Sequence, residues 1–387
     1  MNTKELKDTF TSLYGDSDEG IHNFFSPGRV NLIGEHTDYN GGYVFPCALS
    51  FGTYLLVRKN HSRIMNFATT NFDHRGAVNL DEPFVREGKS WINYPLGVLN
   101  EFRKKALEVE GLDLLYSGDI PNGAGLSSSA SIEMVTAYAM NQLYHFELGR
   151  MELARLSQAA ENDFVGVNCG IMDQFASGLG AAGHALFLNC DTLDYKRVPL
   201  KLEGMKIVIA NTNKRRGLAD SKYNERRAQC EAAVDAIRRE KPIRHLSDLN
   251  LQEFKDLSHL VKDETVRRRA MHVISENQRT LDAIDALSKN DVEGFGRLMN
   301  QSHDSLRQDY EVTGKELDTL VEEARKVKGT LGSRMTGAGF GGCTVSIVRE
   351  EAVESFIREV GQAYSDKIGL KADFYVAEIG DGSKQLN

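Results

Sequence analysis

The chain has few cysteines and no pattern of cysteine or histidine that would bind a metal. Its five cysteines, Cys47, Cys169, Cys190, Cys230 and Cys343, are odd in number and widely spaced, and no two form a Cys-x-x-Cys pair. This spacing indicates neither a disulfide framework nor structural zinc, so we expect most of them to be buried free thiols. The ten histidines are equally scattered, without a His-Glu-x-x-His or His-x-His cluster, and they predict no transition-metal site.

Long apolar runs and an excess of positive charge are also absent. No apolar stretch approaches the length that spans a bilayer, and the charged first residues, Met1 to Asp8, lack the apolar region of a secretory signal. We therefore expect a cytoplasmic protein that does not associate with membranes. The net charge of -8 and the pI near 5.8 argue against a nucleic-acid partner, because a phosphate backbone needs a clustered basic face.

What remains is the composition of an ordinary globular protein, with 41% hydrophobic and 26% charged residues. At roughly 100–200 residues per domain, the length of 387 residues predicts two domains. No internal repeat or low-complexity linker marks the boundary between them. We place it near residue 200, which gives an N-terminal lobe over 1–200 and a C-terminal lobe over 201–387, and we expect the protein to be a monomer.

The hydrophobic periodicity predicts a mostly β first portion, a helical middle and a mixed end, which together indicate an α+β fold. A glycine-rich stretch over 166–183 is expected to be a flexible loop around Asp173. The expected helices cover 4–14, 132–143, 151–164, 224–241, several segments within 243–330, and 351–367; the expected strands cover 52–58, 76–80, 112–117, 184–190, 193–198, 205–211, 343–349 and 371–378.

The segment Pro121-Asn-Gly-Ala-Gly-Leu-Ser-Ser-Ser-Ala-Ser131 has the composition of a phosphate-binding loop. Its two glycines let backbone N–H groups approach an anion, and three consecutive hydroxyls follow. The segment lies between an expected strand and an expected helix, and a helix N-terminus favours a bound phosphate. The same residues also fit an ordinary strand-to-helix turn with a serine N-cap.

Two well-known nucleotide motifs are excluded. The pattern Gly337-x-Gly339-x-x-Gly342 matches the dinucleotide fingerprint, but that fingerprint requires a helix after it and here a strand is expected. The loop at 121–131 lacks the Gly-Lys-Ser/Thr of a Walker A element. Neither His-Arg-Asp nor Asp-Phe-Gly occurs, so a protein kinase is excluded as well.

Two further features could complete a phosphate-transfer site. Mg²⁺ prefers oxygen ligands, of which the protein usually supplies one or two, and the Ser129 hydroxyl and the Glu161 carboxylate could do so. From its helical pattern alone, Glu161 fits a solvated helix residue better. The stretch from Arg29 to Asp38 sets charged and ionisable side chains among glycines, which suits the hydroxyls of a polyol, although a surface turn would have the same composition.

Three motifs resemble those of galactokinases, which belong to the GHMP superfamily of small-molecule kinases. Gly28-Arg-Val-Asn-Leu-Ile-Gly-Glu-His-Thr-Asp-Tyr-Asn-Gly-Gly42 is similar to the galactokinase signature, and Gly123-Ala-Gly-Leu-Ser-Ser-Ser129 to the superfamily's phosphate loop. Met335-Thr-Gly-Ala-Gly-Phe-Gly-Gly342 is similar to the third superfamily motif. The resemblance implies a bilobal α+β fold with a ferredoxin-like C-terminal lobe, which contains the motif 335–342, and an active site between the lobes.

The resemblance also implies a role for each matching residue, and it reverses the interpretation of Glu161 as a solvated residue. Where many galactokinases have a serine near the adenine, this chain has Thr69, which keeps the hydroxyl. The implied roles are Asp173 as catalytic base and Arg29 as transition-state cation; Glu35, His36, Asp38 and Tyr223 as sugar contacts; Ser129 and Glu161 as Mg²⁺ ligands; and Gly123, Ala124, Gly125, Leu126, Ser127, Ser128, Ser129 and Thr69 as ATP contacts.

The implied reaction is transfer of the γ-phosphoryl group of ATP to the C1 hydroxyl of galactose, which gives galactose 1-phosphate and ADP. Asp173 would accept the hydroxyl proton, and Arg29 would keep that carboxylate ionised and offset charge on the transferring group. Two alternatives stay open at this point. One is a galactose and ATP sensor without turnover, which the intact Ser129-Ala130-Ser131 and the presence of Asp173 disfavour. The other is a kinase for N-acetylgalactosamine.

Overall fold

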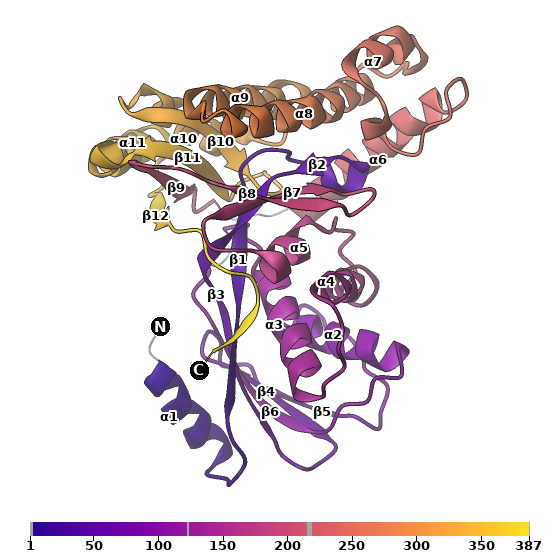
Figure 1. Cartoon of the computed structure of the whole chain (residues 1–387), viewed down its shortest axis with the longest axis vertical. Coiled ribbons are helices and arrows are strands. Elements are labelled where there is room, and N and C mark those ends of the chain that lie inside the picture. The colour runs from indigo at the N-terminus through magenta and orange to yellow at the C-terminus, as the bar shows by residue number, and fades with distance from the viewer. Residues whose placement is uncertain (1–2, 122–123, 215–218, 387) are drawn as a thin grey trace.

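The computed structural model describes residues 3–121, 124–214 and 219–386. Two sheets, each with its own helices, form the lower and upper parts of the molecule in the view of Figure 1, and a small third sheet lies between them. Within the described ranges, no helix is both long enough and apolar enough to cross a bilayer.

The first sheet has six strands in the order β13-β1-β3-β6-β4-β5. Helices α2 to α5 cover one face, and residues such as Leu55, Leu114, Met134 and Phe175 form the core between them. The strands are β1 (His22–Asn31), β3 (Pro46–Lys59), β4 (Ile64–Thr69), β5 (Gly76–Asn79), β6 (Leu112–Gly118) and β13 (Lys384–Leu386), and the helices are α2 (Asn93–Lys104), α3 (Ser128–Leu143), α4 (Arg150–Ala159) and α5 (Met172–Leu179).

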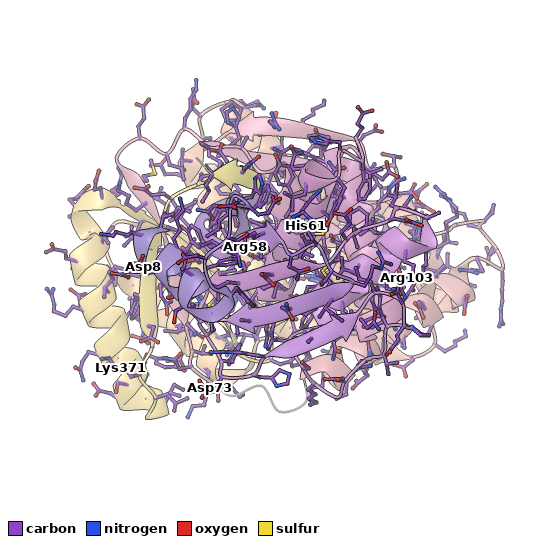
Figure 2. The ribbon with its side chains drawn as sticks, turned by 90° about the horizontal axis from the view of Figure 1, so that it is seen from below. Asp8, Arg58, His61, Asp73, Arg103 and Lys371 are labelled. Atoms are coloured by element: carbon purple, nitrogen blue, oxygen red, sulfur yellow. The ribbon has the colours of Figure 1, made fainter. Side chains whose placement is uncertain are left out.

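Helix α1 (Thr3–Tyr14) packs on the other face of this sheet through Phe10, which lies in a cluster with Leu56 and Leu115. Arg58 on β3, labelled in Figure 2, fixes the end of this helix. Its guanidinium donates to the carbonyl oxygens of Gly15 and Tyr14 at 2.9 Å each, and it pairs with the buried Asp113. Arg58 thereby satisfies carbonyls that the end of a helix leaves without a partner.

The second sheet is antiparallel, with four strands in the order β10-β11-β9-β12. Taken along the chain, the elements run strand, helices, two strands, helix, strand, and this order confirms the expected ferredoxin-like arrangement. The strands are β9 (Met205–Asn211), β10 (Thr330–Thr336), β11 (Cys343–Arg349) and β12 (Asp373–Ala377), and the helices are α6 (Ala219–Ile237), α7 (Leu251–Leu257), α8 (Glu264–Ser288), α9 (Val292–Ser305), α10 (Gly314–Lys326) and α11 (Val353–Ile368).

The third sheet has the order β2-β7-β8, with β2 (Tyr43–Val44), β7 (His184–Asn189) and β8 (Tyr195–Pro199). Short 3₁₀ or π turns complete the fold: η1 (Asp38–Asn40), η2 (Ala160–Val165), η3 (Leu246–Asp248), η4 (Ser258–Leu260), η5 (Leu306–Tyr310) and η6 (Glu350–Ala352). β2 follows directly after the segment that contains Glu35 to Asp38, so that segment lies where the two parts of the molecule meet.

The α+β class with two lobes is confirmed, but three local expectations differ from the structure. Arg29 does not lie in a loop, because Phe24 and Val30 bury the segment as strand β1. Asp173 lies in the first turn of α5 and not in a flexible loop, because the apolar side chains of Met172 and Phe175 pack that segment as a helix. Glu161 lies in the π-helical turn η2 that follows α4.

The last strand, β13, was not predicted because it has only three residues. It pairs with β1, so the end of the chain lies in the sheet of the N-terminal part. The division into 1–200 and 201–387 stays a prediction.

Candidate active site

An ion pair between Arg29 on β1 and Asp173 on α5 lies at the centre of the site. Arg29 Nε donates to Asp173 Oδ1 at 2.7 Å and Nη2 donates to Oδ2 at 2.8 Å, so the pair is bidentate. Arg29 is only 4% exposed. Burial opposes the charge of Arg29, but the charges of Asp173 and Glu35 outweigh it and raise the pKa of this guanidinium.

The phosphate loop contacts this pair directly. Arg29 Nη1 donates to the carbonyl oxygen of Gly125 at 2.8 Å, and the Ser127 hydroxyl donates to Asp173 Oδ2 at 2.6 Å. Ser127 has a left-handed backbone (φ 62°) and precedes α3 without capping it by its side chain, so its hydroxyl is available to Asp173. Ser128 and Ser129 form the first turn of α3, where N–H groups lack helical partners.

Glu35, one of the predicted sugar contacts, pairs with a buried cation from the C-terminal part of the chain. Arg334 on β10 is fully buried, and its Nη2 donates to Glu35 Oε2 at 2.8 Å. Burial raises the pKa of Glu35, and the charges of Arg334 and Arg29 oppose that rise. This ion pair fixes the Glu35 carboxylate beside the cavity.

The neighbouring His36 is neutral. Burial first, and then the charge of His272, hold the pKa of His36 well below its ordinary value. Its Nδ1 lies 2.8 Å from the Tyr39 hydroxyl, and its ring centroid lies 5.8 Å from that of Tyr223 on α6. His36 and Tyr223 thus form one polar and aromatic wall of the cavity.

Asp38 is half-buried and abuts the backbone of Gly170. A Cβ added at Gly170 would lie 1.9 Å from Asp38 Oδ2, so only glycine leaves room for this carboxylate. Burial, followed by the charge of Asp173, raises the pKa of Asp38 to about 7.

Glu161 is buried in a second group of carboxyls. Gln174 Nε2 donates to Glu161 Oε2 at 2.6 Å and to Glu133 Oε2 at 3.0 Å. Burial and the charge of Asp173 raise the pKa of Glu161 to about 7, although a hydrogen bond from Ser129 opposes the rise. Burial and the charge of Glu161 raise the pKa of Glu133 well above its ordinary value.

This oxygen-rich group fits Mg²⁺. Burial and the charge of Asp173 penalise the charge of Glu161, and no described lysine or arginine pairs with Glu161. Among the described residues, no three His, Cys, Asp or Glu side chains form a complete metal site. Mg²⁺ does not need one, because it retains water and phosphate ligands.

These side chains line one cavity of about 750 Å³. Ala124 and Leu126 are buried residues of the phosphate loop and do not line the cavity, Thr69 lies at the end of β4 outside the lining, and Gly123 falls outside the described residues. The predicted residues that the structure brings together there are Arg29, Glu35, His36, Asp38, Gly125, Ser127, Ser128, Ser129, Glu161, Asp173 and Tyr223.

Another part of the lining was not predicted from the sequence. Arg86, Lys89, Ser90 and Tyr94 line the same cavity from the segment that leads into α2. Two cations around a glycine ahead of a helix could have pointed to an anion site, but this loop has no recognisable motif.

Asp38 leads to a prediction about stability. Its folded-state pKa of about 7 exceeds the value of about 4 in an unfolded chain, so its contribution to stability is full below about pH 4 and is lost as the pH rises to about 7. Relative to Asp38→Asn, we expect the unfolding free energy of the ligand-free wild type to fall by about 2 to 3 kcal/mol between about pH 4.5 and about pH 8. Urea denaturation measures this difference, and parallel pH curves for the two proteins would contradict it.

Known proteins are similar to this chain over nearly its whole length. The family model "Galactokinase galactose-binding signature" matches residues 8–59, "GHMP kinases N terminal domain" matches 93–181, and "GHMP kinases C terminal" matches 283–366. A galactokinase from Fusobacterium nucleatum is 53% identical over 98% of this chain and 98% of its own length.

Similarity to solved structures leads to the same family. Lactococcus lactis galactokinase complexed with galactose superposes with a TM-score of 0.97 at 44% identity and covers 99% of both chains. Methanococcus jannaschii mevalonate kinase has a TM-score of 0.66 at 20% identity, covers 96% of this chain and 99% of its own, and shares the fold. Since the sequence similarity extends over nearly the full length and the signature match includes Arg29 to Asp38, the chain belongs to the galactokinase family of the GHMP kinases.

Proposed function

We propose that this protein transfers the γ-phosphoryl group of ATP to the C1 hydroxyl of D-galactose. The observation that carries the proposal is the bidentate pair of Arg29 and Asp173 beside the N-terminal turn of α3, in a cavity that Glu35 and Asp38 also line. This arrangement supports a site in which a proton acceptor, an anion site and polar sugar contacts act together. The relatives support a galactokinase, and they support neither the sensor nor the N-acetylgalactosamine kinase.

Asp173 acts as the general base. Its two carboxylate oxygens accept three hydrogen bonds from Arg29 and Ser127, which fix its orientation. It takes the proton of the C1 hydroxyl as the oxygen attacks the phosphorus atom, and the guanidinium of Arg29 offsets negative charge on the transferring group.

The sugar is oriented by groups that differ in hydrogen-bonding character. The carboxylates of Glu35 and Asp38 accept hydrogen bonds from sugar hydroxyls, while neutral His36 and the Tyr223 hydroxyl can each donate or accept. Because Arg334 and Gly170 constrain the two carboxylates, the site is organised before the sugar enters.

ATP binds with its phosphates at the N-terminal turn of α3, where the backbone amides favour an anion. Ser129 and Glu161 would hold Mg²⁺ through a hydroxyl and a carboxylate oxygen, and the bound ion would supply positive charge that offsets the charge of the phosphates. The assignments of Thr69 and Gly123 to the nucleotide, the cytoplasmic location and the monomeric state stay predictions.

The proposal is tested by an ATP-coupled assay of the purified protein with galactose, N-acetylgalactosamine, glucose and mevalonate as separate substrates. We expect turnover with galactose far above the other three. Galactose binding in calorimetry without phosphorylation would instead identify a sensor, and preference for N-acetylgalactosamine would identify the other kinase.

Replacing Asp173 with asparagine should remove the base and keep the shape of the site. We expect kcat to fall by at least about 100-fold, the usual lower bound for a general base, while galactose and ATP dissociation constants change less than about threefold. Steady-state kinetics and calorimetry measure the two effects. An unimpaired kcat would refute the assignment of Asp173.

Replacing Glu161 with glutamine should weaken the hold on Mg²⁺. We expect the Mg²⁺ concentration that gives half-maximal rate to rise by about tenfold or more, because a neutral amide oxygen is a poorer ligand than a carboxylate. Glu152→Gln on α4, which removes an exposed ion pair with Lys105, is the matched control and should leave that concentration unchanged. An equal Mg²⁺ requirement in both variants would speak against the ligand.

Replacing Gly170 with alanine should displace the Asp38 carboxylate, since the new Cβ would lie 1.9 Å from Asp38 Oδ2. A misplacement of about 1 Å can cost on the order of 100-fold in rate, so we expect the KM for galactose to rise by about tenfold or more and the KM for ATP to stay within about twofold. Gly149→Ala is the control, because a Cβ there meets no atom within 4 Å. If Gly170→Ala keeps the wild-type KM for galactose, Asp38 does not contact the sugar.

A further inference from the structure

The backbone of the segment that contains Glu35 and His36 is held by a helix from the other part of the molecule. Glu276 on α8 is fully buried, and its Oε1 accepts hydrogen bonds from the backbone N–H of Gly34 at 3.0 Å and of Glu35 at 3.2 Å. The same oxygen accepts a hydrogen bond from the Ser302 hydroxyl at 2.6 Å. One carboxylate oxygen thus binds two consecutive peptide groups of the sugar-binding segment.

A second residue of α8 binds the carbonyl group of the same residue, Glu35. His272 lies one helical turn before Glu276, and its Nε2 is 3.1 Å from the carbonyl oxygen of Glu35. A carbonyl oxygen can only accept, so Nε2 carries the proton and donates it. His272 and Glu276, which share one face of α8 at a spacing of four residues, therefore hold both the N–H and the C=O of Glu35.

A third contact fixes the end of the segment. Asn277 Oδ1 accepts a hydrogen bond from the backbone N–H of Tyr43 at 2.7 Å. Between these contacts the backbone is left-handed at Gly34 (φ 91°) and at His36 (φ 63°). A non-glycine residue adopts this conformation only when its surroundings impose it, and α8 provides such surroundings for His36.

The carboxylate of Glu276 is suited to this task because it is charged. Burial would raise its pKa, but the charge of Arg279, whose Nε donates to Oε2 at 2.7 Å, and the charge of His272 outweigh burial and lower the pKa to about 2. Glu276 is therefore an acceptor over the whole physiological pH range. Hydrogen bonds from backbone amides to a charged acceptor are stronger than those to a neutral one.

We propose that Glu276, together with His272, is a positioning residue for the sugar: by holding the peptide of Glu35 it sets the directions in which Glu35 and His36 enter the cavity. This inference rests on the proposed function, because it assumes that these two side chains contact galactose. Helix α8 thus controls sugar affinity without touching the sugar. Among the residues that the structure describes, α8 makes no hydrogen bond to the phosphate loop, so we expect ATP affinity not to depend on it.

The test measures galactose and ATP binding separately on the full chain by calorimetry. Glu276→Ala leaves the two amides without their acceptor, and we expect the galactose dissociation constant to rise by at least about tenfold and that for ATP to change by less than about threefold. The KM for galactose should rise more than kcat falls, because the base and the phosphate loop keep their contacts. Ile274→Ala on the same helix, buried in the cluster with Cys230 and Ile237, controls for lost stability and should leave galactose affinity unchanged.

A rescue experiment separates positioning from general support of the fold. Glu276→Gln retains one oxygen acceptor but sets an amide N–H against the donating Arg279, so we expect weakened galactose binding. Adding Arg279→Met removes that conflict, and the double variant should recover galactose affinity to within about threefold of wild type, although the ion pair is lost.

Each outcome decides between the proposals. If wild type binds no galactose, the proposed function fails. If wild type binds galactose and Glu276→Ala binds it equally well, only the positioning role is refuted. A double variant that binds galactose as poorly as Glu276→Ala, or an Ile274→Ala variant with the same loss, would also refute that role.

Discussion

The bidentate ion pair of Arg29 and Asp173 is the contact on which the site depends. It joins β1 to α5 across 144 residues of sequence, and through Gly125 and Ser127 it also fixes the loop between them. A buried guanidinium is costly unless all its donors are satisfied, and Arg29 uses its Nε and both terminal nitrogens. The strand, the loop and the helix therefore have to be placed together. The ladder of β1 with β3 from His22 to Asn31 provides the rigid frame for this placement.

More carboxyl groups than buried cations line the cavity or lie next to its lining residues. Arg29 and Arg334 pair with Asp173 and Glu35, whereas Asp38, Glu133 and Glu161 have no arginine or lysine partner among the described residues, and burial raises the pKa of each. Such an environment is unfavourable for the anionic ATP unless cations compensate for it. Arg86 and Lys89 at the cavity wall and the N-terminal turn of α3 supply part of that charge, and Mg²⁺ at Glu161 supplies more under the proposed function.

The helices and strands that depend on a local residue pattern could be predicted from the sequence. The strand over 343–349 matches the structure, and the helix expected over 132–143 is present but begins within the serine loop at Ser128, because hydrophobic spacing and the glycine-rich loops are local signals. Asp173 was placed in a loop because neighbouring glycines hid the short apolar stripe of α5. Arg334, Glu276 and Gln174 could not be predicted as parts of the site. Each acts through a partner far away in sequence, up to 299 residues for Arg334 and Glu35, and neither composition nor periodicity contains that information.

These long-range contacts explain why the cavity needs both parts of the molecule. The signature segment supplies Glu35 and His36, but Arg334 on β10 pairs with one and Tyr223 on α6 packs near the other. Under the proposed function, the first two hundred residues contain the base, the cation and the phosphate loop, yet they leave the sugar-binding segment without the groups that fix its backbone and its charge. Since β13 returns to pair with β1, the C-terminal part is anchored to the first sheet as well as to that segment. A relative displacement of the two parts would therefore change the wall of His36 and Tyr223 before it changed the phosphate loop.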